Sequence, residues 1–363
     1  LAQMALSLMG VRRQLDSNAD GKFAAQEQDM ITLVEEVVSG MVQHLKARHH
    51  TYPDDVWIVH DLVLMWMTEE EASRRMGTVW HDLDNYLKEL FQQVLDFLRY
   101  TPLLRYAQPC GAVVQTVHME EYQRAFRALD LRSLGVRYTA VLLEELGLLE
   151  DDPSFVEAAK AQLDIDHATL LQADPGAGSQ NWCLFRFQVT ALVNGEWRSF
   201  EELNGIRVRS SGNDPVALTL ADPPFEAHLQ AVKLSNDRLN HRKRDAEFRA
   251  IAHVSGMLRR LFPDADALMM ERVWWGKNVH GWFQMYVTEV PCLSCLGAMV
   301  QFAKRFPNVK LKVSYPRRYF ASPPSEPHHH PTPSSSSALK TSINNNNNNN
   351  GDDAAAAAAA PAA

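Results

Sequence analysis

The chain carries the residue types of a catalytic metal site in two short sequence motifs. Asp245 and Glu247 are two residues apart. Cys292 and Cys295 follow in a Pro-Cys-x-x-Cys motif, whose first cysteine lies 45 positions after Glu247. Thiolates and carboxylates bind zinc, and three protein ligands leave a fourth position open for a water whose pKa the metal lowers. The pattern predicts zinc at Asp245, Cys292 and Cys295, with Glu247 as a free carboxylate that moves protons.

The segments around these residues are predicted to position them at the starts of two helices. The order helix, strand, helix, strand is expected at residues 244–261, 281–290, 294–306 and 309–315. Asp245 and Glu247 then fall in a first helical turn, where the helix N-terminus favours carboxylates. The cysteines fall at the strand-to-helix turn after Pro291 and in the next first turn, where backbone N–H groups stabilise thiolates.

The stretch from about Lys233 to Tyr315 resembles the cytidine-deaminase-like superfamily, and within it the bacterial polymorphic-toxin deaminases and their eukaryotic relatives. The resemblance is carried by the segments DAEFRAIAHV and TEVPCLSCLGAMVQFAKRFPNVKLKV. It implies a three-layer α/β/α domain behind an N-terminal helical region. It also implies a zinc-dependent hydrolase that removes the exocyclic amine of a nucleobase, converting cytosine to uracil in nucleic acid.

One site residue departs from the pattern of that superfamily. Glu247 and the two cysteines match the motif directly, whereas Asp245 stands where the family has a histidine. Aspartate is itself a zinc ligand. His241, one turn upstream, and His280, in the preceding loop, are the alternative ligands.

The part of the chain around the motif is basic, although the whole chain has a formal net charge of −8. Residues 233–320 carry 16 Lys and Arg against seven Asp and Glu, whereas residues 1–232 carry 19 against 34. A basic surface beside a base-modifying site suits a polyanionic substrate, and aromatic rings there can stack on a flipped base. The residues assigned to substrate binding are Arg242, Lys243, Arg244, Trp274, Trp275 and Trp282.

Two other functions stay open at this point. An enzyme that deaminates a free nucleoside or a modified base would not need the basic surface. A catalytically dead deaminase module in a calcium-regulated interaction protein would tolerate the loss of Glu247.

Residues 1–172 are expected to form a helical region. Apolar residues recur at helical spacing at 30–44, 61–67, 79–99, 120–131, 139–149 and 154–163. Trp57, Trp66 and Trp80 lie on or beside these apolar stripes, so they are expected in the core.

Residues 16–27 fit the twelve-residue calcium loop of an EF-hand. Gly21 stands at the sharp turn of that loop. The expected ligands are the side chains of Asp16, Asn18, Asp20 and Glu27 and the backbone carbonyl of Lys22. The alternative is an ordinary turn between two helices, because EF-hands normally pair and the sequence shows no second loop.

Residues 173–180 (ADPGAGSQ) are expected to link the helical region to a deaminase-like domain at 181–320. That domain should begin with a β-hairpin turning at Asn194-Gly195, followed by a loop at 210–222 and a helix at 224–234. Residues 321–363 contain poly-Asn and poly-Ala tracts, so they are expected to be a disordered tail.

The composition also bears on the compartment. The sequence has no run of about 18 apolar residues, so it predicts no membrane span. Four cysteines, two of them assigned to metal, are too few for a disulfide framework. This favours a reducing compartment, the cytoplasm or the nucleus.

Overall fold

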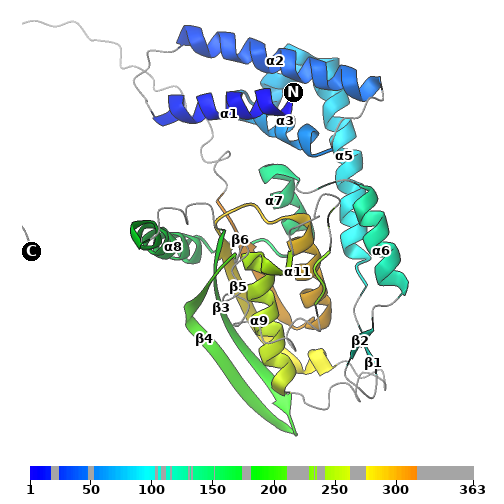
Figure 1. The fold of residues 1–363 in the computed structure, drawn as a ribbon, viewed down its shortest axis with the longest axis vertical. Helices are drawn as coiled ribbons and strands as arrows, with labels where there is room; N and C mark the ends of the chain where they lie inside the picture. Colours follow the sequence, from blue (N-terminus) through cyan, green and yellow to red (C-terminus); the bar gives the residue numbers. More distant parts are fainter. Residues whose placement is uncertain are drawn as a thin grey trace, which may run out of the picture. The chain divides into compact units, whose positions relative to one another are not determined.

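The structure is a computed structural model. It describes residues 1–17, 24–47, 53–102, 105–107, 112–114, 117–129, 131, 134–150, 152–173, 181–210, 229–232, 234, 242–261 and 275–316. All of them belong to one compact unit, Leu1–Ala321 (Figure 1). The predicted tail and linker, apart from Ala173 at the end of a helix, lie outside the described residues.

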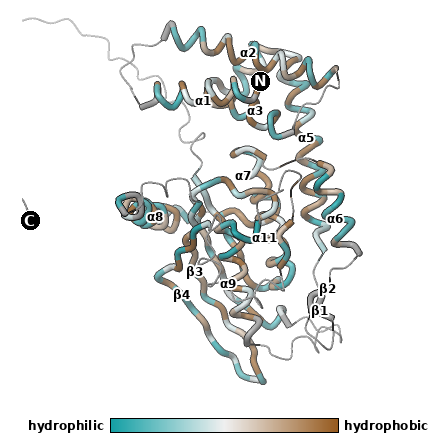
Figure 2. The backbone as a smooth tube through the Cα atoms, viewed as in Figure 1, coloured by the Kyte–Doolittle hydropathy of each residue, from teal (hydrophilic) through white to brown (hydrophobic). Residues whose placement is uncertain are grey.

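Helices dominate the first half of the chain, as the apolar spacing predicts. They are α1 (Ala2–Ser17), α2 (Ala24–Lys46), α3 (Pro53–Trp66), α4 (Glu69–Met76), α5 (Thr78–Arg99), α6 (Val117–Ala128), α7 (Gly135–Glu145) and α8 (Pro153–Ala173). Hydrophobic and hydrophilic residues alternate along these helices (Figure 2). A short hairpin that the sequence did not reveal, β1 (Arg105–Ala107) with β2 (Ala112–Val114), separates α5 from α6. None of the described helices is long and apolar enough to cross a membrane.

Three tryptophans confirm the predicted core of the helical part. Trp57, Trp66 and Trp80 are all buried. Trp57 meets the ring of Tyr138 edge-on, with 4.7 Å between the ring centroids, so α3 and α7 share one aromatic core.

The second half of the chain builds a four-stranded mixed sheet. Its strands are β3 (Trp182–Val193), β4 (Glu196–Arg209), β5 (Val279–Val287) and β6 (Val309–Ser314), in the order β4-β3-β5-β6. β3 is antiparallel to both of its neighbours, whereas β5 and β6 are parallel. The expected hairpin turn lies between β3 and β4, where Asn194 and Gly195 both have positive φ, as a tight two-residue turn requires.

Helices pack against both faces of this sheet (Figure 1). α9 (Ala246–Leu261) and α11 (Leu293–Arg305) cover one face, where Phe283 of β5 meets Phe302 of α11 at 5.4 Å. α8 covers the other face, where Phe155 packs with Leu184 of β3 and Tyr286 of β5. The alternation of side chains along β3 and β5 produces these two apolar faces. The result is an arrangement of helices on both sides of a small mixed sheet.

Part of the chain before the predicted linker also belongs to the packing around the sheet. α8 lies on one sheet face, and Leu149, just before it, forms a parallel bridge to Val313 at the edge of β6. Lys304 of α11 donates to the backbone carbonyls of Arg99 and Thr101. The contacts of the sheet thus reach into the stretch assigned to the helical region.

One predicted helix is wrong in the part that can be seen. A helix was expected at 224–234, but residues 229–232 and 234 are not helical, and 224–228 lie outside the described residues. The backbone of Gln230 pairs instead with the side chain of Gln301 on α11, with hydrogen bonds of 3.0 and 2.8 Å. Tertiary contact here replaces the local helical hydrogen bonds.

The helical part also buries two ionisable residues side by side on α3. Asp61 accepts a hydrogen bond from the backbone N–H of Val136 at 3.0 Å, so it caps the start of α7. A Cβ on Gly135 would lie 2.4 Å from that carboxylate, so the close approach requires glycine. His60 is fully buried against Trp80 and Tyr138, and neither ring nitrogen has a hydrogen-bond partner among the described residues.

Burial of His60 predicts a specific loss of stability in acid. Burial, together with the nearby Arg137 and against the opposing charge of Asp84, lowers the pKa of His60 from 6.5 to about 3. Below pH 6.5 the unfolded chain binds a proton at His60 that the folded chain excludes. The contribution of His60 therefore leaves the free energy of unfolding unchanged above pH 6.5 and lowers it as the pH drops towards 3. At pH 5 the cost is at most about 2 kcal/mol.

Thermal unfolding of wild type and His60→Leu between pH 7.5 and 4.5 tests this expectation. The variant should lose less stability in acid than wild type does, because only wild type must keep an imidazole neutral. Burial raises the pKa of Asp61 to about 7, and this residue contributes the same pH dependence of stability to both proteins. His81→Leu, at an exposed position of α5, is the matched control. Parallel curves for wild type and His60→Leu would contradict the expectation.

Candidate metal centre

Three predicted ligands meet at the starts of two helices. The carboxylate oxygen Oδ2 of Asp245 lies 3.4 Å from each of the sulfurs of Cys292 and Cys295, and the two sulfurs lie 3.5 Å apart. Both cysteines are free thiols. These residues form the one cluster of at least three potential metal ligands among the described residues.

The spacing of the three atoms fits a tetrahedral ion. Zinc with bonds of about 2.3 Å to sulfur and about 2.1 Å to oxygen would hold two sulfurs about 3.8 Å apart and a sulfur and an oxygen about 3.6 Å apart. The observed separations are a few tenths of an ångström shorter. Two sulfurs and one carboxylate oxygen are also a donor set that zinc accepts, so the residues present fit that metal.

Helix starts place these ligands. The carbonyl of Asp245 accepts the first helical hydrogen bond of α9, from the N–H of Arg249 at 3.1 Å, so Asp245 occupies the N-cap position. Cys292 is the N-cap of α11, with an extended backbone, and Cys295 lies in the first turn of that helix. Helix N-termini attract negative charge, and here two of them face the same cluster.

Without a cation, ionising the three groups of the cluster is unfavourable in free energy. The hydrogen bond from Cys292 and burial raise the pKa of the Cys295 thiol well above its usual range. Burial raises the pKa of Asp245 as well, although Arg242 counteracts this. Cys295 is buried and Asp245 and Cys292 are half-buried, so ionisation of all three groups is unfavourable without a nearby positive charge.

Glu247 lies within the same buried site but is not one of the clustered ligands. Its side chain is 2% exposed, and its Oε1 accepts a hydrogen bond of 3.2 Å from the side-chain amide of Asn181. Its Oε2 has no hydrogen-bond partner among the described residues. Burial, assisted by the charge of Asp245, raises the pKa of Glu247 to about 7. A carboxyl group with such a pKa can both accept and release a proton near neutral pH.

A short hydrogen-bond network, which the sequence did not reveal, orients Glu247. The hydroxyl of Thr288 accepts from the backbone N–H of Trp182 at 2.9 Å and donates to Oδ1 of Asn181 at 2.8 Å. The Asn181 amide group must then point its N–H towards Glu247. Asn181 directly precedes β3 and Thr288 directly follows β5, and no spacing in the sequence marks either residue.

The structure brings only some of the predicted substrate residues to the cluster. The guanidinium of Arg242 lies 3.5 Å from Oδ2 of Asp245, in the short 3-10 helix η4 (Arg242–Arg244), which places Lys243 and Arg244 next to the site in the chain. Trp282 lies on the other face of the sheet, because it is adjacent to Phe283, which faces α11, and it contacts Arg186. Trp282 therefore lies on the sheet face opposite α9 and α11.

Of the remaining candidates near the motif, three cannot be placed and one lies away from the cluster. Trp274 and His241 lie outside the described residues, as does the side chain of Trp275 in η5 (Trp275–Asn278). His280 is exposed on β5, where it meets the ring of Trp197 edge-on at 5.5 Å. Among the described residues no histidine joins the three ligands.

The calcium loop stays a prediction. α1 ends at Ser17 and α2 begins at Ala24, so two helices flank the loop as an EF-hand requires. Asn18, Asp20 and Lys22 lie outside the described residues, as does the side chain of Asp16. Glu27, the expected closing ligand, pairs with the guanidinium of Arg12.

Comparison of the chain with protein-family models, with curated proteins and with solved structures gives no match. The geometry of the cluster and the motif residues are therefore what points to a function.

The geometry predicts one equivalent of zinc per chain in purified full-length protein. Cys292→Ser should lose most of it, because the serine hydroxyl is a poor zinc ligand compared with a thiolate. Cys183→Ala is the matched control, since Cys183 is a buried free cysteine outside the cluster. Elemental analysis after dialysis measures the metal, and equal zinc in wild type and Cys292→Ser would contradict the assignment.

Proposed function

We propose that this protein is a zinc-dependent deaminase that converts cytosine to uracil in nucleic acid. The observation that carries the proposal is the pairing of a three-ligand cluster with a separate, buried carboxylate at its side. A purely structural zinc site uses four protein ligands and needs no such carboxylate. A catalytic site leaves one position open and uses a nearby acid–base group.

The reaction is hydrolytic. The oxygen of a water bonds to the ring carbon that carries the exocyclic amine, the bond between that carbon and the amine nitrogen breaks, and ammonia leaves. Zinc held by Asp245, Cys292 and Cys295 would make that water a stronger nucleophile near neutral pH. Overall, protons must move from the water to the ring and to the leaving amine.

Glu247 is suited to move these protons. Its Oε1 is held by Asn181, whereas Oε2 keeps its lone pairs available within the described site. The carboxylate can accept a proton from the water through Oε2 and pass it to the departing nitrogen. Asn181 and Thr288 do not need to touch the substrate; they fix the direction in which Glu247 faces.

A phosphate backbone is the proposed feature that distinguishes the substrate from a free nucleoside. Arg242 lies at the cluster, Lys243 and Arg244 follow it, and Asp245 comes next in the chain. These side chains can contact phosphates on either side of a base that enters the site. Binding that uses them should weaken as salt rises, because each contact releases condensed counterions.

The test of this function uses full-length protein with single-stranded DNA and RNA oligonucleotides that contain one cytosine. Mass spectrometry detects the replacement of the amine by oxygen. Glu247→Gln should keep zinc and thermal stability while activity falls by roughly 10²–10⁴-fold, as expected for a positioned acid–base group. Thr288→Val should lower activity and Thr288→Ser should not, because only the serine keeps the hydroxyl that orients Asn181.

The outcomes separate the alternatives. Zinc-loaded wild type that deaminates neither oligonucleotides nor cytidine would indicate a catalytically dead module. Wild type that processes cytidine as well as oligonucleotides, without dependence on salt, would indicate a free-nucleoside enzyme. Unchanged deamination by Glu247→Gln would refute the role of Glu247.

A further inference from the structure

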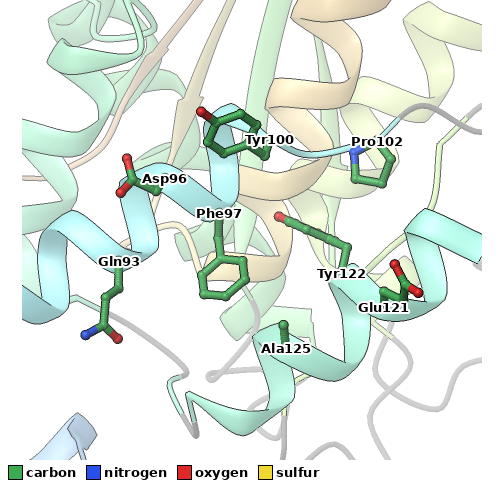
Figure 3. Close-up of a pocket in the computed structure, with 8 residues that line it drawn as sticks. All are labelled: Gln93, Asp96, Phe97, Tyr100, Pro102, Glu121, Tyr122 and Ala125. Carbon is green, nitrogen blue, oxygen red and sulfur yellow. The ribbon is translucent and has the colours of Figure 1, made fainter.

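A groove on the helical part of the chain lies outside the metal centre and has no role in the proposed reaction. It has a volume of about 670 Å³ and lies between the C-terminal half of α5 and the N-terminal half of α6. Phe97 of α5 and Tyr100, which directly follows α5, line one side, and Tyr122 and Ala125 line the other side from α6 (Figure 3). Its size falls within the range of sites that bind small molecules and peptide side chains.

The floor of the groove is aromatic and fixed in place. The rings of Phe97 and Tyr122 meet edge-on at 6.2 Å, and Phe126 stacks behind Tyr122 at 5.7 Å. The hydroxyl of Thr101 donates a hydrogen bond of 2.8 Å to the Tyr122 hydroxyl oxygen, so the ring cannot turn freely. A preformed floor binds a ligand without first paying the entropy of ordering its own side chains.

Tyr100 is the solvent-exposed aromatic residue of the groove. It is 81% exposed, the highest value among the exposed large hydrophobic residues that the structure describes. Tyr100, the residue that directly follows α5, lies three positions after Phe97, and Tyr122 and Ala125 are one turn apart on α6. The apolar surface therefore follows the seam between two helices, as in grooves that receive a segment of peptide.

The charge of the groove selects one kind of ligand. Asp96 and Glu121 are the charged residues among the described lining, which holds no Lys, Arg or His. In Figure 3, Asp96 on α5 and Glu121 on α6 lie on opposite sides of the rings of Phe97 and Tyr122. Aromatic faces and carboxylates both attract cations, and an Arg or Lys side chain can place its charge on a ring while its methylene groups fill apolar space. The same carboxylates repel the phosphates of nucleic acid or of anionic lipid.

We propose that this groove is a docking site for a peptide segment of a partner protein that presents Arg or Lys side chains together with apolar side chains. The apolar side chains occupy the surface of Phe97, Tyr122 and Ala125. The cationic groups lie against Tyr100 and near Asp96 and Glu121. This site is independent of the deaminase reaction, and it separates the recognition of a protein partner from the basic surface at the metal centre.

Peptide binding to the full-length chain tests the proposal. The probe is a fluorescein-labelled amphipathic peptide of about three helical turns with Leu and Phe on one face and Arg on the other. Its comparison peptide carries Glu in place of each Arg. Fluorescence anisotropy should show saturable binding of the Arg peptide, weaker binding at higher salt, and no binding of the Glu peptide.

Three variants locate the binding. Asp96→Asn combined with Glu121→Gln should weaken binding by about fivefold to tenfold, the order expected for two charge pairs at a surface. Tyr100→Ala should weaken it without unfolding the chain, because the side chain is exposed. Glu120→Gln is the matched control, since Glu120 is the exposed neighbour of Glu121 and does not line the groove.

Each result supports or overturns the proposal. Weaker binding in the double variant and in Tyr100→Ala, with no change in Glu120→Gln, supports it. Equal binding of the Arg peptide to wild type and to the double variant would place the interaction elsewhere on the acidic surface and overturn it. No peptide binding, with binding of tetramethylammonium to the same residues, would replace the peptide by a small cation and also overturn it.

Discussion

The candidate site depends on one structural constraint: the N-termini of α9 and α11 lie side by side. Asp245 occupies the start of one helix and Cys292 the start of the other, and their ligand atoms are 3.4 Å apart. The parallel pairing of β5 with β6 requires a crossover, and α11 is that crossover. Because α9 packs on the same face of the sheet, the two helix starts can share one cluster.

That constraint brings groups together that repel one another when they are ionised. The buried cluster holds a carboxylate and two thiols, and Glu247 adds a second carboxylate beside them. Structures rarely bury so many acidic groups without a compensating cation, because the free energy of removing each charge from water is large. A divalent metal would compensate for it, and the two helix N-termini and the guanidinium of Arg242 add further positive potential.

The sequence predicted the parts of this site whose signals are local. The hairpin follows from Asn194-Gly195, and the helix starts follow from the apolar spacing after Asp245 and Cys292. The alternation along β5 separates Trp282 from Phe283, but it does not say which face carries the site. That information comes from α11, whose Phe302 packs on Phe283.

The features that the sequence did not predict depend on long-range contacts. Asn181 meets Glu247 across 66 positions of the chain, and Thr288 meets Asn181 across 107, so no local pattern marks either residue. The segment at 229–232 is not the expected helix, because the backbone of Gln230 pairs with the side chain of Gln301. The groove between α5 and α6 likewise exists only once two helices pack and leave one face of each uncovered.

The central claim is that one carboxylate and two thiolates hold an open zinc site, and X-ray absorption at the zinc edge tests it most directly. Full-length protein should show two sulfurs at about 2.3 Å and two oxygen or nitrogen neighbours at about 2.0–2.1 Å, without the outer-shell signal of an imidazole. Such a spectrum would identify Asp245 as the third ligand and leave one position for a water. A first shell of four sulfurs, or an imidazole signal from a histidine in place of Asp245, would contradict the account.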